Sequence, residues 1–134
     1  MQKPEKVLDK RRVNALFKDV DVNRLGKLML GFDGRVSLAL SRKLVGGIWV
    51  GGNAYLTPTR LEFEPNGLNK MFHKNAEALR VVIDLRELQP VTRRFGVGTK
   101  IIDLKTQDMT MSLRCLNSAR FADAIENARI NLDT

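Results

Sequence analysis

Residues able to perform acid–base or nucleophilic chemistry are few in this chain of 134 residues. The single histidine, His73, lies in a polar stretch with no aspartate or cysteine at a useful spacing, although acid–base catalysis needs such a partner. The single cysteine, Cys115, ends an alternating apolar segment and is expected to be a core thiol rather than a nucleophile. Glu87 and Asp103 are isolated carboxylates, expected to be surface charges. The sequence therefore predicts a protein that is not an enzyme.

Cofactor and metal sites are not indicated either. Gly96-Val97-Gly98 lacks the further glycines and the following helix of a dinucleotide-binding loop, so a hairpin turn is expected there. One cysteine permits no intrachain disulfide and argues against a structural zinc site. We expect no cofactor and no metal.

The remaining chemical signal is positive charge. The net charge is +8, from 23 Lys+Arg against 15 Asp+Glu, which favours anionic partners. No apolar run reaches the roughly 18 residues of a transmembrane helix, and no secretory signal follows Met1. The expected protein is cytoplasmic, with peripheral association with a membrane if its ligand is a lipid.

The N-terminal segment has helical spacing. Val13, Leu16, Phe17 and Val20 stand at i, i+3, i+4 and i+7, which predicts a helix between Glu5 and Val20 with one apolar face. Its basic run, Lys10-Arg11-Arg12, would suit a membrane-surface helix or a phosphate-contacting arm, but docking of the apolar face on the rest of the domain is the favoured use.

From Val36 onward the apolar period changes to two, which predicts β-strands. The glycine pair Gly51-Gly52 within one of them indicates a bulge or a sharp bend. The expected strands number seven: Val36–Leu40, Ile48–Leu56, Arg60–Glu64, Leu79–Ile83, Val91–Phe95, Thr99–Lys105 and Met109–Cys115.

A helix is expected to close the chain. Asn117 or Ser118 would cap it, and the apolar stripe comprises Phe121, Ile125, Ala128 and Leu132. The predicted fold class is therefore mostly β (α+β), a small barrel or sandwich with a packed helix. We expect residues 1–32 to form an N-terminal helical extension and residues 33–134 to form the domain.

The middle of the chain resembles a known family. The segment from Gly51 to Phe63, GGNAYLTPTRLEF, is similar to the hallmark of GRAM domains, in which a glycine and an aromatic–Leu–Thr precede Arg–Leu–x–Phe. The later segment from Val82 to Leu88 looks like that family's fourth strand. The resemblance implies the pleckstrin-homology-like fold, a bent seven-stranded β-sandwich plugged by a C-terminal helix. It also implies one core containing Leu61, Phe63, Met111, Leu113, Phe121 and Ile125.

The same resemblance implies where a ligand would bind. In pleckstrin-homology-like domains, loops at the open end of the sandwich hold anionic head groups. Arg42 and Lys43 would be shared by two alternative pockets, one completed by Lys70 and Lys74, the other by Arg93 and Arg94. Guanidinium and ammonium groups pair strongly with phosphate when they converge. The alternative is that all six are solvated charges. Arg60 is expected to pair with Glu62 or Glu64 instead.

Two functions remain open at this point. One is a peripheral adaptor that recognises anionic phospholipid head groups or an acidic surface. The other is a protein–protein interaction or self-association module without a lipid ligand, including a homo-oligomer. Nucleic acid is not favoured, because aromatic residues form only 6% of the chain and fall mostly at inward positions.

Overall fold

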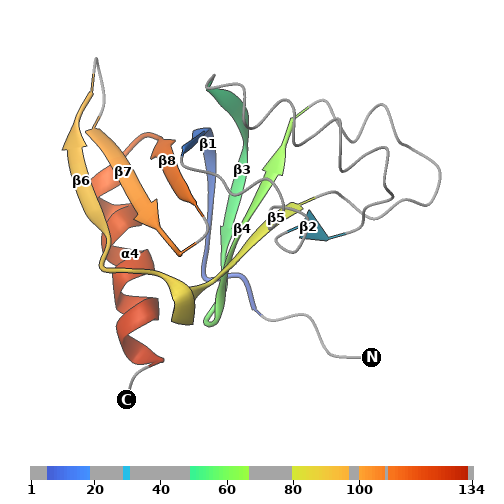
Figure 1. Cartoon of the computed structure of the whole chain (residues 1–134), viewed down its shortest axis with the longest axis vertical. Helices are drawn as coiled ribbons and strands as arrows, with labels where there is room; N and C mark the ends of the chain where they lie inside the picture. Colours follow the sequence, from blue (N-terminus) through green and yellow to red (C-terminus); the bar gives the residue numbers. More distant parts are fainter. Residues whose placement is uncertain are drawn as a thin grey trace.

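The fold is an antiparallel β-sheet with one C-terminal helix (Figure 1). The computed structural model describes residues 6–18, 49–66, 80–96, 100–107 and 109–132, and the backbone of residues 29–30. The predicted strand Val36–Leu40 lies outside these ranges. The elements are β1 (Asp9–Lys18), β2 (Met29–Leu30), β3 (Val50–Leu56), β4 (Arg60–Pro65), β5 (Arg80–Asp84), the short 3-10 helix η2 (Leu85–Glu87), β6 (Thr92–Phe95), β7 (Lys100–Lys105), β8 (Thr110–Arg114) and α4 (Ser118–Asn131).

The strands follow the order β2-β5-β4-β3-β1-β8-β7-β6. Every neighbouring pair is antiparallel, and β2 contributes only two residues. Among the described residues β2 and β6 do not pair with one another, so this sheet is not closed. The mostly β class is confirmed.

The prediction of an N-terminal helix between Glu5 and Val20 is wrong. Asp9–Lys18 is a strand at the centre of the sheet, with β3 on one side and β8 on the other. Val13, Ala15 and Phe17 alternate into the core at 2%, 0% and 3% exposure, which is the period of a strand. Helical spacing was also satisfied locally, but hydrogen bonding to two partner strands decided the conformation. The segment is an integral strand and not an extension.

The sheet divides at β1. Its residues from Asp9 to Ala15 pair with β3, whereas those from Asn14 to Lys18 pair with β8. One end of β1 therefore belongs to the β3–β5 half and the other end to the β6–β8 half, which Figure 1 shows on either side of it.

Gly51 and Gly52 continue the β3 register without an inserted residue, so they form no bulge. A Cβ on Gly52 would lie 2.3 Å from the carbonyl oxygen of Glu64 and 2.7 Å from the ring of Phe63. Gly52 is therefore required by the close approach of β3 to its neighbours in β4.

The core lies between the inner face of the sheet and α4. The six core residues expected from the resemblance are all buried in one cluster, which confirms that part of the prediction. The apolar stripe of the closing helix is also confirmed, with Phe121, Ile125 and Ala128 buried and Leu132 packed against the core. Figure 1 shows α4 lying along the β6–β7 side of the sheet, with its N-terminus at the upper end.

Candidate functional site

The segment that resembles the GRAM hallmark forms the β3–β4 hairpin. Thr57 is 2% exposed, and its Oγ1 accepts hydrogen bonds from the backbone N–H groups of Arg60 at 2.9 Å and Thr59 at 3.3 Å. Its own N–H donates to the carbonyl of Arg60 at 2.8 Å. The threonine thus closes the turn by satisfying backbone groups that the strands leave unpaired.

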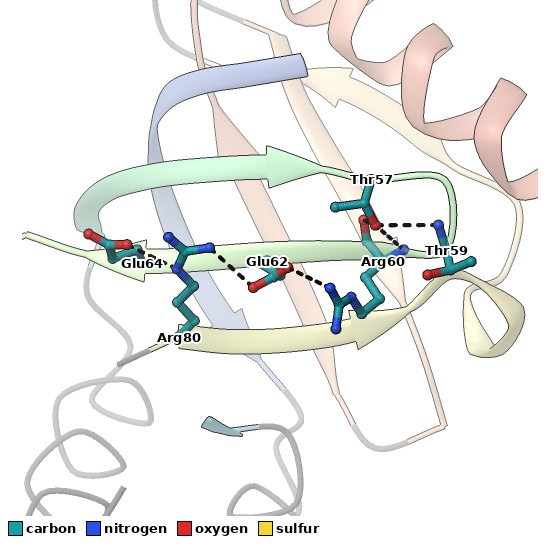
Figure 2. A network of polar contacts seen from close by, with 6 residues as sticks. All are labelled: Thr57, Thr59, Arg60, Glu62, Glu64 and Arg80. Carbon is teal, nitrogen blue, oxygen red and sulfur yellow. Dashed lines mark hydrogen bonds and ion pairs between the residues drawn. The ribbon is translucent and has the colours of Figure 1, made fainter. Parts of the chain in front are cut away.

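Beyond the turn, the hairpin carries an ion-pair network across β4 and β5 (Figure 2). Arg80 reaches Glu62 at 3.3 Å and Glu64 at 3.0 Å, and Arg60 reaches Glu62 at 3.5 Å. The prediction that Arg60 pairs with Glu62 or Glu64 is confirmed for Glu62. Because Glu62 is only 6% exposed, two guanidinium groups beside it compensate its desolvation.

The charges of this network compensate one another. Two arginines face two glutamates, so the network as a whole carries no excess charge. The ring of Tyr55 fills the space beside it, with the guanidinium carbon of Arg80 4.3 Å and the ammonium of Lys10 5.3 Å from its centroid. The hallmark segment is therefore a structural element of the sheet and a poor candidate for ligand binding.

A different arrangement surrounds β6, the last strand in the sheet order. Arg93 and Arg94 are adjacent on this strand, so their side chains leave on opposite faces of the sheet. Arg94 donates from Nε to Asp103 at 2.8 Å, and Asp103 also accepts a hydrogen bond from the hydroxyl of Ser112 at 2.6 Å. Asp103 is thus held by β6 and β8 together, and Arg94 is already neutralised.

Arg93 lies on the other face, together with Lys100 of β7. Both side chains are exposed, and neither has a hydrogen bond or ion pair with any other residue that the structure describes. Together they line a surface hollow of about 350 Å³ next to the connection from β8 to α4, and a smaller neighbouring hollow beside Phe95. We call Arg93 and Lys100 the cationic pair.

The start of α4 forms another wall of the larger hollow, which Asn117, Ser118 and Ala119 line. Asn117 is the N-cap residue, as expected, but it has a left-handed backbone with φ 54° and its side chain makes no capping hydrogen bond. No acidic side chain stands in the first turn. Nothing on this wall opposes an anion near the cationic pair.

Cys115 also borders this hollow and is 8% exposed. Burial raises the pKa of its thiol, the charge of Arg11 opposes that rise, and the charge of Asp9 adds to it. A thiol with a raised pKa is a poor nucleophile, which agrees with the expected core role. Within the described part of the chain, no three His, Cys, Asp or Glu residues gather as a metal site would require.

Of the six predicted site residues, the structure places two. Arg93 and Arg94 leave β6 on opposite faces and both border the smaller hollow, where Arg94 is already paired with Asp103. The other four, as well as His73, lie outside the described residues: Arg42, Lys43, Lys70 and Lys74.

Sequence reasoning missed Lys100, Phe95 and Leu116, which adjoin the same hollows. The first two could have been found from the hairpin turn expected at Gly96–Gly98. Strands on either side of that turn place Phe95 opposite Lys100, as the β6–β7 register has them. Leu116 carried a weaker signal, an apolar residue between the last strand and the helix cap.

No helix in the described ranges is both long enough and apolar enough to cross a membrane.

Comparison with known proteins gives the fold and no more. No protein-family model matches the chain, and no curated protein matches it. Among solved structures, the chain is similar to the C-terminal domain of an unknown protein from Leishmania infantum, with a TM-score of 0.59 and 15% sequence identity. The match covers 94% of this chain and 85% of that one. At this identity the similarity concerns the course of the backbone and carries no function.

Proposed function

We propose that the chain is a non-catalytic binding module with a pleckstrin-homology-like fold of the GRAM branch, and that it recognises anionic phospholipid head groups or an acidic surface. The observation that carries this proposal is the cationic pair. Arg93 and Lys100 come from two neighbouring strands, line the same hollow, and have no acidic partner among the described residues.

The fold assignment is supported by element order. In the described part of the chain, seven strands of four or more residues, β1 and β3 to β8, precede the helix α4, which packs against the core. The sheet changes partners at β1, as a bent sandwich requires, and the hairpin from Gly52 to Phe63 carries the family-like residues. The N-terminal strand β1 is one of these seven, although the sequence pattern had predicted a helix there.

Charge supports an anionic ligand. Arg60, Arg80 and Arg94 have carboxylates within 3.5 Å. Arg93 and Lys100 have none among the described residues, a property they share with Arg12 and Arg114, but they also line one hollow together. Converging cations gain most when a phosphate or carboxylate ligand supplies the missing negative charge.

Vesicle co-sedimentation tests the proposal. The double variant Arg93→Gln with Lys100→Gln removes the cationic pair, and each basic residue near an anionic membrane contributes about 1 kcal/mol. The expected loss in partitioning is about 30-fold, since about 1.4 kcal/mol is a factor of ten. Binding of the unmodified protein should also weaken steeply as salt is raised.

A matched control loses the same net charge elsewhere. The side chains of Arg86 in η2 and of Lys105 are both exposed and have no hydrogen bond or ion pair in the described part of the chain. Lys105 is at the far end of β7, about 17 Å from Lys100 at roughly 3.4 Å per residue. The variant Arg86→Gln with Lys105→Gln should bind within about threefold of the unmodified protein. If both double variants lost vesicle binding equally, binding would depend on net charge and not on the cationic pair, which would contradict the proposal.

A protein-interaction module is the second candidate, and one specific observation favours it. β6 ends the strand order, and all four of its residues are exposed. An exposed edge strand is a template for an added strand from a partner or a second copy. Light scattering coupled to size-exclusion chromatography distinguishes the two, because self-association through β6 would give a concentration-dependent mass in the absence of lipid.

A further inference from the structure

The two most exposed large apolar side chains of the described residues line the same hollows as the cationic pair. Phe95 is 87% exposed and Leu116 is 83% exposed, whereas the next most exposed large apolar residue among those described, Leu8, reaches 51%. Phe95 lines the smaller hollow and Leu116 the larger one, and Arg93 and Lys100 line both. Figure 1 shows the end of β6 and the start of α4 at the same end of the molecule.

Exposure of one apolar residue is ordinary, but two such residues beside unpaired cations are not. The ammonium of Lys100 lies 5.4 Å from the ring centroid of Phe95, so the charge and the ring form one unit. This pairing of apolar and basic groups is what an interface between water and lipid selects. Apolar side chains enter the acyl boundary there while flexible cations stay at the depth of the phosphates.

We propose that Phe95 and Leu116 insert into the interfacial region of an anionic bilayer, while Arg93 and Lys100 bind the lipid phosphates. This inference rests on the proposed function and adds the apolar half of the contact. It commits the site to a membrane surface rather than to an acidic protein.

Two other occupants fit less well. In a symmetric contact with a second copy, each cationic pair would face another cationic pair, and the chain as a whole has a net charge of +8. An acidic protein would need a pocket shaped for each projecting side chain, whereas fluid lipid accommodates projections without a preformed shape. An 87% exposed ring projects from the surface instead of lining a groove.

Tryptophan placement tests insertion directly. In a Trp49→Phe background, single substitutions Phe95→Trp, Leu116→Trp and Ile130→Trp each provide one fluorophore. Ile130 is 47% exposed near the C-terminal end of α4, about 18 Å from the first turn at roughly 1.5 Å per residue, and is the control. With vesicles of phosphatidylcholine and phosphatidylserine containing brominated acyl chains, positions 95 and 116 should show blue-shifted and quenched emission, and position 130 should not.

Removal of the apolar groups gives a second readout. The variant Phe95→Ala with Leu116→Ala should fold normally, because both side chains are exposed. Its partitioning into vesicles should fall about 30-fold, because the variant lacks the favourable transfer of these two partly inserted side chains from water to the bilayer. Its residual binding should be more sensitive to salt than that of the unmodified protein.

The outcomes separate the two proposals. If the unmodified protein sediments with anionic vesicles but both tryptophans stay unquenched and the alanine variant binds equally, insertion is refuted and the proposed anionic recognition stands. If the unmodified protein does not bind anionic vesicles at all, both are refuted. Equal quenching at position 130 would mean non-specific adsorption and would also overturn the insertion.

Discussion

Replacement of Gly52 by alanine tests how closely β3 approaches β4. The added Cβ would lie 2.3 Å from the carbonyl oxygen of Glu64, about 1 Å short of ordinary contact. It would also lie 2.7 and 2.9 Å from two ring atoms of Phe63, which is 0% exposed and has no free space into which to move. The obstacles are a backbone atom and a packed ring, so the strands themselves must shift.

The neighbouring glycine provides the matched control. A Cβ on Gly51 would lie 3.3 Å from the side-chain oxygen of Asn14, an exposed residue that can rotate away. Overpacking a rigid site costs about 1–3 kcal/mol, and Gly52→Ala belongs at the upper end of that range. Gly51→Ala should fall within about 0.5 kcal/mol of the unmodified protein, because alanine lowers the entropy of the unfolded chain.

Urea denaturation measures the difference in the free energy of unfolding. For a slope of about 2 kcal/mol per molar urea, a loss of about 3 kcal/mol lowers the midpoint by about 1.5 M. A midpoint for the Gly52→Ala variant equal to that of the unmodified protein would refute the close approach of β3 to Glu64 and Phe63. A loss in Gly51→Ala as large as in Gly52→Ala would show that glycine is needed for backbone conformation and not for space.

Two further changes test the polar contacts that hold the domain together. Burial opposes ionisation of Glu126, but hydrogen bonds from Arg129 and a backbone N–H lower the pKa of its carboxyl from the ordinary 4.5. The ionised carboxylate therefore stabilises the fold fully above pH 4.5, and this stabilisation is lost as the pH falls through the lowered pKa. The Glu126→Gln variant should have a lower free energy of unfolding than the unmodified protein at neutral pH and the same free energy of unfolding in acid. A difference between the two proteins that does not vary with pH would contradict this. The Glu62→Gln substitution should lower the free energy of unfolding, measured by urea titration, by about 1–2 kcal/mol, because Arg80 loses a charged partner at a position that is 6% exposed. The control Glu87→Gln, at an exposed position, should change the free energy of unfolding little. Similar values for the two variants would refute the stabilising role of the network.

Local patterning predicted the elements whose two faces differ clearly. β4, β7 and β8 alternate apolar and polar residues, and each lies where the alternation placed it within one or two residues. The closing helix was equally predictable, because its apolar stripe repeats at helical spacing and a sheet leaves one face to cover. In these elements, side-chain period and tertiary burial agree.

The N-terminal segment shows where local pattern fails. Val13, Leu16 and Phe17 satisfy the helical period, and Val13, Ala15 and Phe17 satisfy the strand period in the same residues. Nothing within the segment itself distinguishes the helical period from the strand period. Hydrogen bonds to β3 and β8, 35 or more residues further along the chain, decide for the strand.

The amino-acid sequence by itself determined an excess of positive charge, a mostly β class, a closing helix and a pair of basic residues, Arg93-Arg94, just before Gly96. Only the tertiary structure decided what those charges do. Adjacent residues of a strand face opposite sides, so Arg94 meets Asp103 while Arg93 joins Lys100 of the next strand and Leu116 beyond β8. A binding surface is a matter of which side chains share a face, and that depends on strand pairing between segments that the local pattern does not connect.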